Sequence, residues 1–308
     1  MSGVAGPVLK WPGSKWRIAD RIAASLPPHT TYLEPFFGSG AVFFRKSPGA
    51  LETINDRDDR VVNLFRVLRE RPDDLARAIA LTPWSRTEYA SVYTLPPFGD
   101  PVEAARRFLV RCWQSHGSRL DRRSGWRHAT GRGDAVPRDY PADWAGLPAR
   151  IAATAARLRA AQIECRPALE VLARHAHPNC LVYADPPYPL ATRGDLFYAV
   201  EMDNDDHRAL LAALVAHPGP VVVSGYACAL YDEALAGWHR ETLAATAEGG
   251  RARTEVIWRN ARAARPQLWA SGWPDTASVP PTRAEVPQDA REGREGYREG
   301  GDGDDSPA

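Results

Sequence analysis

The chain has 308 residues, 44% of them hydrophobic and 25% charged, and a formal net charge of +1. This composition is typical of a globular protein with a substantial core, built as one large domain with an insertion or as two domains. Its four cysteines are dispersed without a C-x-x-C pair, which argues against a disulfide framework and a zinc cluster. The amino terminus lacks a signal-peptide core, and no stretch approaches the roughly 20 apolar residues of a membrane helix. We therefore expect a cytoplasmic protein with no membrane contact and no metal site.

Strand-like and helix-like segments alternate along most of the chain. In chain order we predict a strand at 30–35, a helix at 40–47, a strand at 51–56, a helix at 59–71, a helix at 149–162, a strand at 163–167, a helix at 168–176, a strand at 180–184, a helix at 203–217, a strand at 220–226 and an antiparallel strand pair at 239–246 and 254–260. Such alternation predicts an α/β fold with an open, mainly parallel sheet covered on both faces by helices.

Residues 82–150 interrupt this alternation and read as an insertion with one clear helix at 101–114. Between 106 and 132 the segment is rich in arginine, has a single aspartate, and carries Trp113 and Trp126. Arginine pairs bidentately with phosphate and aromatic rings stack on bases, so this composition favours a polyanionic partner. The alternative is a solvated helix face followed by a loop.

The insertion divides the sheet-forming part into 1–81 and 151–265. The remaining residues, 266–308, are rich in proline, glycine and charge and have no hydrophobic period. They offer too little apolar surface to offset the entropy of ordering, so we predict a disordered tail.

The sequence YLEPFFGSGAVFF places Glu34, Phe36, Gly38 and Gly40 where a predicted strand ends. Ligands of open α/β sheets settle at the carboxyl ends of the strands, and glycines there allow a tight turn and close approach of the backbone to a ligand. The helix that follows presents free N–H groups. A phosphate-binding loop would need G-x-G-x-x-G or a G-K-[ST] ending, and neither is present.

Asp56 ends the next predicted strand, 16 residues after Gly40. Nucleotide-binding folds place a carboxylate near this position to accept hydrogen bonds from both ribose hydroxyls. With no phosphate loop nearby, the pattern favours a nucleoside over a dinucleotide, and Glu34 would add a negative charge beside a cationic ligand. The alternative for Asp56 is an N-cap of the helix that starts near Asp58.

The sequence CLVYADPPY brings Asp185 to the end of a buried strand and follows it with Pro186, Pro187 and Tyr188. Prolines lack an N–H and fix φ near −65°, so their carbonyl groups remain free as acceptors. One carboxylate and one rigid carbonyl can together hold an NH₂ group by both hydrogens, and Tyr188 offers a flat face to a planar ring. These residues predict a pocket for an aromatic amine.

Four motifs, WPGSK, EPFFGSG, IND and DPPY, follow one another in this order along the chain. In these motifs the sequence from about Val8 to Asn260 resembles the DNA adenine methyltransferase (Dam-like, D12 class) family. The resemblance implies a Rossmann-like fold that uses S-adenosylmethionine to methylate the N6 amine of a flipped adenine in double-stranded DNA, at a specific site. It makes 1–81 with 151–265 the catalytic domain and 82–150 the inserted, mostly helical DNA-recognition domain.

The resemblance also implies roles for individual residues. The residues implied to hold the cofactor are Trp11, Lys15, Glu34, Phe36, Gly38, Gly40, Asp56 and Asp185. Asp56 would take the ribose hydroxyls, Asp185 and the Pro186 carbonyl would hold the target amine, and Tyr188 would stack on the extruded adenine. The family often has two glycines where this chain has Gly13 and Ser14, a departure that leaves the lysine in place.

Two further expectations concern the nucleic acid. The candidates for contacts with phosphate or guanine are Arg119, Arg122, Arg123, Arg127 and Arg132. Tyr198, ten residues past Tyr188, is a candidate second wall of the base pocket, with an ordinary buried aromatic as the alternative.

Three alternatives to the main hypothesis stay open at this point. The pocket could hold the N4 amine of cytosine, it could act on adenine in structured RNA, or the fold could serve as a binding protein without turnover. Both the acid and the tyrosine of the DPPY motif are present, which argues against loss of turnover. A cognate restriction endonuclease is a candidate partner.

Overall fold

The computed structural model describes residues 4–94, 99–118, 120–130, 139–193, 196–246 and 252–264. The predicted disordered tail at 266–308 lies outside the described residues, as do Arg119 and Arg132.

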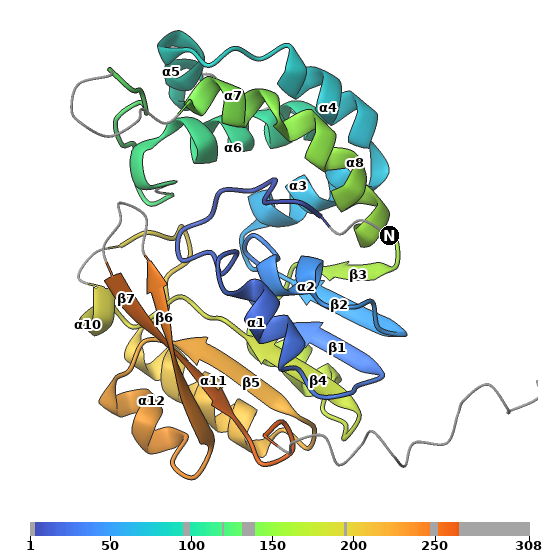
Figure 1. Ribbon diagram of the computed structural model, residues 1–308, viewed down its shortest axis with the longest axis vertical. Coiled ribbons are helices and arrows are strands. Elements are labelled where there is room, and N and C mark those ends of the chain that lie inside the picture. Colours follow the sequence, from blue (N-terminus) through green and yellow to red (C-terminus); the bar gives the residue numbers. More distant parts are fainter. Residues whose placement is uncertain are drawn as a thin grey trace, which may run out of the picture. The chain divides into compact units, whose positions relative to one another are not determined.

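A seven-stranded sheet forms the centre of the described chain (Figure 1). Its strands are β1 (Thr31–Glu34), β2 (Leu51–Asn55), β3 (Ala161–Glu164), β4 (Cys180–Ala184), β5 (Val221–Gly225), β6 (His239–Thr246) and β7 (Ala252–Arg259), in the order β3-β2-β1-β4-β5-β7-β6. The first five strands are parallel, and β7 runs antiparallel to both β5 and β6. The predicted α/β fold and its antiparallel final pair are therefore confirmed. β3 and β7 differ most, since each begins two residues before the predicted strands at 163–167 and 254–260.

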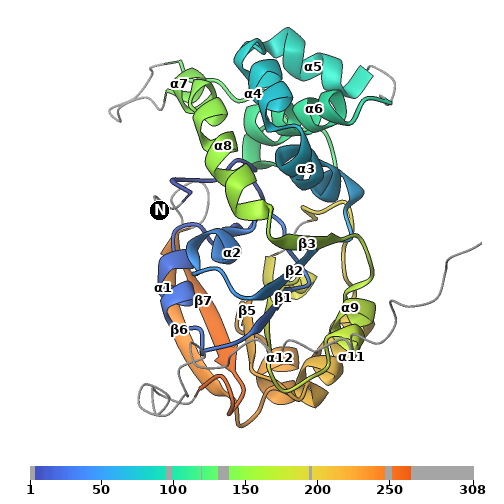
Figure 2. The same ribbon diagram turned by 90° about the vertical axis from the view of Figure 1, so that its right-hand side faces the viewer.

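Helices cover both faces of the sheet (Figure 2). Side chains of a strand alternate between its two faces, so Leu33, Val182 and Val223 pack with α9 (Ala168–Arg174), α11 (Asn204–Ala216) and α12 (Ala229–Ala234). Tyr32, Tyr183 and Val222 belong to the other core, with α1 (Ala19–Ala24), α2 (Ala41–Arg45) and α3 (Asp59–Glu70). A short helix, α10 (Leu190–Arg193), follows the DPPY motif.

The remaining helices form a layer in which they pack on one another and on α3. They are α4 (Pro72–Ala80), α5 (Arg86–Thr94), α6 (Pro101–Gln114), α7 (Tyr140–Ala145) and α8 (Leu147–Leu158). α4 lies before residue 82 and packs on α8, which continues past residue 150, and α3 packs on both α6 and α8. The helical layer therefore extends beyond both ends of the predicted insertion. Residues 82–150 as a separate recognition domain stay a prediction. Among the described helices, none is long and apolar enough to cross a bilayer.

A buried ionic cluster ties this helical layer to the sheet. Glu52 on β2 is fully buried and pairs with Lys46, and Arg157 on α8 donates to both of its carboxylate oxygens, at 2.5 and 2.8 Å. The Arg157 guanidinium also lies 3.7 Å from the ring centroid of Phe43 on α2. Removing one partner from such a cluster would leave an uncompensated charge in the core.

Candidate active site

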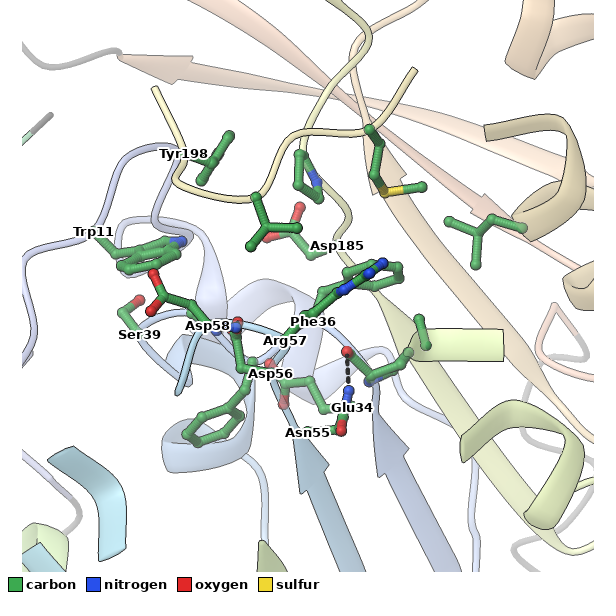
Figure 3. A pocket seen from close by; sticks show the side chains of 18 of the residues that line it. Trp11, Glu34, Phe36, Ser39, Asn55, Asp56, Arg57, Asp58, Asp185 and Tyr198 are labelled. Atoms are coloured by element: carbon green, nitrogen blue, oxygen red, sulfur yellow. Dashed lines mark hydrogen bonds between the residues drawn. The ribbon is translucent and has the colours of Figure 1, made fainter. Parts of the chain in front are cut away.

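A cavity of about 170 Å³ opens at the carboxyl ends of β1, β2 and β4 (Figure 3). This is the edge at which open α/β sheets bind ligands. Its lining comes from the N-terminal loop, the loops after β1, β2, β3 and β4, and the segment before α11. The lining includes Trp11, Lys15, Glu34, Phe36, Gly38, Ser39, Asp56, Leu169, Asp185, Pro187, Tyr198, Glu201 and Met202.

The turn after β1 needs its two glycines. Gly38 and Gly40 have φ values of 49° and 66°, the left-handed region that side chains disfavour. A Cβ atom on Gly38 would lie 2.7 Å from Nε1 of Trp11, and one on Gly40 would lie 2.4 Å from the ring of Phe37. The side chain of Ser39 meets that of Ser14 at 2.7 Å, which fastens this turn to the N-terminal loop.

Asp56 is held rigidly beside the glycine turn. Its Oδ2 accepts from the backbone N–H of Gly38 at 2.8 Å, and its Oδ1 accepts from that of Asp58 at 2.9 Å. Burial raises the pKa of Asp56 to about 6, although these N–H groups favour the ionised form. The side chain of Asp58 caps α3 by accepting from the N–H of Arg60, so the N-cap interpretation of Asp56 is wrong.

Glu34 is the second acid of this edge and is only 2% exposed. Its Oε2 accepts from the Tyr32 hydroxyl at 2.7 Å. Burial raises the pKa of Glu34 to about 8, and the nearby Asp185 carboxylate adds to this effect; the Tyr32 hydrogen bond and two cations, Lys46 and Arg157, offset only part of it. Near neutral pH Glu34 therefore holds a proton that a cation in the cavity would displace.

Asp185 lines the same cavity as the glycine turn and Asp56. Its Oδ1 accepts from the Lys15 ammonium at 2.9 Å and from the Ser224 hydroxyl, also at 2.9 Å. Ser224 in turn meets the Tyr183 hydroxyl at 2.9 Å. Within the described residues we find no hydrogen bond to Oδ2, which makes it the acceptor available to a ligand. The two acids, the glycine turn and Lys15 are thus brought together as predicted from the motifs.

Pro186 and Tyr188 lie behind the lining. Tyr188 is 5% exposed, and its hydroxyl donates to Glu255 on β7 at 2.6 Å. The Lys15 ammonium lies 4.7 Å from its ring centroid, and Tyr226 meets it edge-on at 4.5 Å. Lys15 therefore lies on the ring that we expect to stack on a base.

Tyr198 lines the cavity beside Trp11, with 5.9 Å between their ring centroids. Its hydroxyl donates to the carbonyl of Pro12 at 3.2 Å, and Figure 3 shows the side chains of Tyr198 and Trp11 close to each other at the cavity. Tyr198 is thus placed as a cavity wall, although its contact with a base stays a prediction.

The family model for D12 class N6 adenine-specific DNA methyltransferases matches residues 11–246. The chain belongs to this family. It is 28% identical over 238 residues to a DNA adenine methylase of Salmonella typhi, an alignment that covers 73% of this chain and 82% of that protein. Two shorter alignments each cover 22% of this chain and about a quarter of the relative: a DNA adenine methylase of Serratia marcescens (35% identical over 69 residues, 25% of that protein) and the type II methyltransferase M1.LlaDCHI of Lactococcus lactis subsp. cremoris (33% over 70 residues, 24% of that protein).

The arginines expected to contact nucleic acid in this D12 family member divide into two kinds. Arg122 and Arg123 are exposed, and the Arg123 guanidinium lies 5.2 Å from the ring centroid of Tyr93. Arg127, in contrast, is 4% exposed and its Nε donates to the Ser115 carbonyl at 2.9 Å. The prediction for Arg127 is therefore wrong: the residue supports the fold because its guanidinium is enclosed by protein.

Several residues of this D12 site were missed in the sequence. Ser224 and Glu255 contact Asp185 and Tyr188 from neighbouring strands, and Arg193 pairs with Glu201 and donates to the Tyr188 carbonyl. Glu201 also accepts from the N–H of Tyr198 at 3.0 Å. The one available signal was Glu255, an acid directly before the apolar run at 256–258.

Proposed function

We propose that this chain transfers a methyl group from S-adenosylmethionine to the N6 amine of an adenine turned out of double-stranded DNA. The observation that carries the proposal is the placement of Asp185 in one cavity with the glycine turn and Asp56, with one carboxylate oxygen available. The family match names adenine and DNA, which favours this substrate over cytosine or RNA.

The lining residues fit S-adenosylmethionine by their chemistry. Asp56, fixed by two N–H groups, keeps carboxylate lone pairs for ribose hydroxyls. Glu34 supplies negative charge for a ligand that carries a sulfonium and an ammonium group, and Trp11, Phe36, Leu169 and Met202 supply apolar surface. When bound, the cofactor supplies an electrophilic methyl group.

The amine of adenine is a poor nucleophile because its lone pair is delocalised into the ring. Oδ2 of Asp185 and the Pro186 carbonyl accept its two hydrogens, which favours a pyramidal nitrogen with its lone pair directed at the methyl carbon. With the cofactor bound, the transfer would form the N–C bond and leave the C–S electron pair on sulfur, and the nitrogen would lose one proton to solvent. Asp185 must be ionised for this role, and its Oδ1 is paired with the Lys15 ammonium at 2.9 Å.

An adenine inside a duplex cannot enter this cavity, so the base must leave the stack at a cost of a few kcal/mol. Exposed Arg122 and Arg123 lie in a short hairpin, closed by the bridge between Ser115 and Trp126, and we assign them to the DNA backbone or bases. The same hairpin meets the cavity wall, because the N–H of Leu120 donates to the Phe197 carbonyl at 3.0 Å. A DNA duplex held there would lie close to the amine pocket.

The test is methyl transfer from tritium-labelled S-adenosylmethionine to duplex DNA and to RNA, followed by mass spectrometry of the nucleosides. We expect N6-methyladenine from DNA with the wild-type chain and none with Asp185→Ala, while Asp185→Ala still binds the cofactor. Equal activity of the two proteins, or methylcytosine as product, would contradict the proposal. A cognate restriction endonuclease stays a predicted partner, supported by the partial similarity to a type II methyltransferase.

A further inference from the structure

A second carboxylate lies behind the DPPY motif and has no part in the function proposed above. Glu255 on β7 is 6% exposed. Its Oε2 accepts the Tyr188 hydroxyl at 2.6 Å and lies 4.0 Å from the Lys15 ammonium. A buried acid at this position is costly to desolvate unless it is paired, and here it contacts Tyr188 of the DPPY motif and Lys15, which in turn pairs with Asp185.

Lys15 connects the two acids. Its ammonium donates to the Gly13 carbonyl at 2.8 Å and to Oδ1 of Asp185 at 2.9 Å. It also lies 4.0 Å from Oε2 of Glu255 and 4.7 Å from the centroid of the Tyr188 ring. Burial alone would lower the pKa of Lys15, but Asp185 and Glu255 together raise it, so the group stays cationic. Glu255 thus helps to keep the charge that holds Asp185.

The orientation of Asp185 follows from these contacts. Lys15 and Ser224 both donate to Oδ1, so the carboxylate cannot rotate without losing two hydrogen bonds, one of them charge-assisted. Oδ2 is then the oxygen presented to the amine. Tyr188, three residues further on, is fixed at its hydroxyl end by Glu255.

We propose that Glu255 is a positioning residue for methyl transfer: through Lys15 and Tyr188 it fixes both ends of the DPPY motif, so that Oδ2 of Asp185 and the Tyr188 ring meet the base in one geometry. The inference rests on the function proposed above and adds a residue to its machinery. A misplaced acceptor lowers the rate of the chemical step much more than it lowers cofactor affinity.

The test compares Glu255→Gln with the wild-type full chain under single-turnover conditions, on duplex DNA with saturating S-adenosylmethionine. Glutamine can still accept from Tyr188 but carries no charge for Lys15. We expect the rate constant of methyl transfer to fall at least tenfold while the dissociation constant of the cofactor stays within twofold. The matched control is Glu241→Gln on β6, the strand that pairs with β7. Glu241 pairs with Arg259 and Arg21 and not with residues of the motif, so this variant should stay within twofold of wild type in both quantities.

A second variant removes the other partner of the hydrogen bond between Tyr188 and Glu255. Tyr188→Phe removes the hydroxyl that donates to Glu255 and keeps the ring, so it should slow transfer without Glu255 being altered, and the double variant should be no slower than the slower single variant. Losses that multiply in the double variant would overturn the proposal. So would a Glu255→Gln rate within twofold of wild type, or an equal loss of rate in Glu241→Gln.

The outcome is separable from that of the proposed function. The product of the wild-type chain decides which amine is methylated, whereas Glu255 is judged only by the ratio of variant to wild-type rates on that same amine. A wild-type chain that methylates cytosine would overturn the proposed substrate and leave the ratio as a valid test. A wild-type chain that transfers no methyl group to DNA or RNA would overturn both.

Discussion

Glu34 makes a quantitative prediction about stability and pH. In the folded chain its pKa is about 8, against an ordinary value of 4.5, because the side chain is buried beside Asp185. Between these two pH values the folded state keeps a proton that the unfolded state has lost, so stability falls as pH rises through this window. A difference of about 3.5 pH units, at about 1.4 kcal/mol per unit, corresponds to about 5 kcal/mol in the free energy of unfolding.

The perturbation that isolates this effect is Glu34→Gln. Glutamine cannot titrate, so the variant does not lose stability in this way. Its free energy of unfolding relative to wild type should grow by about 4 kcal/mol between pH 4.5 and pH 8.5, since part of the full effect lies outside this range. Urea unfolding of both proteins at pH 5, 7 and 9, followed by tryptophan fluorescence at constant ionic strength, measures the difference. Stability curves that run parallel across this range would refute the reasoning, since Glu34 would then be ionised in the folded chain throughout.

Three further predictions concern binding and the core. Binding of S-adenosylmethionine at pH 7 should release a proton from Glu34, which calorimetry detects as a binding heat that depends on the ionisation enthalpy of the buffer. Glu34→Gln should not release this proton. The same buffer dependence in the variant and in wild type would contradict the prediction. Glu52→Gln should lower the free energy of unfolding by about 3 to 5 kcal/mol in urea, because two buried cations lose their partner; a loss below 1 kcal/mol would contradict this. Arg123→Ala should reduce the slope of log affinity for DNA against log salt by about 1, as measured by fluorescence anisotropy, whereas Arg127→Ala should lower stability and leave the slope unchanged.

Much of the fold and the centre of the site could be predicted because the relevant signals are local. The alternation of strands and helices specified the parallel sheet, and the carboxyl ends of parallel strands share one edge. Glu34, Asp56 and Asp185 each follow or end such a strand, so their meeting in one cavity required only the strand order.

Other features depend on contacts between segments distant in the sequence. Arg127 was expected at the nucleic acid because it lies in a basic segment, yet its guanidinium is enclosed by the hairpin and by Tyr140. Charge composition does not distinguish an arginine that packs against backbone carbonyls from one that faces solvent. Only the packing of the hairpin on α6 and α7 decides between them.

Glu255 was not predicted as a site residue because its strand runs in the opposite direction to the parallel strands. Asp185 could be predicted because it follows β4, a buried strand that runs towards the cavity. β7 runs the opposite way, and its Val256 pairs with Gly225 at the carboxyl end of β5. An antiparallel strand therefore brings residues near its beginning to the functional edge. In a sheet of this order, acids in the first half of β7 belong among the candidates for the site, and Glu255 is the residue that this rule selects here.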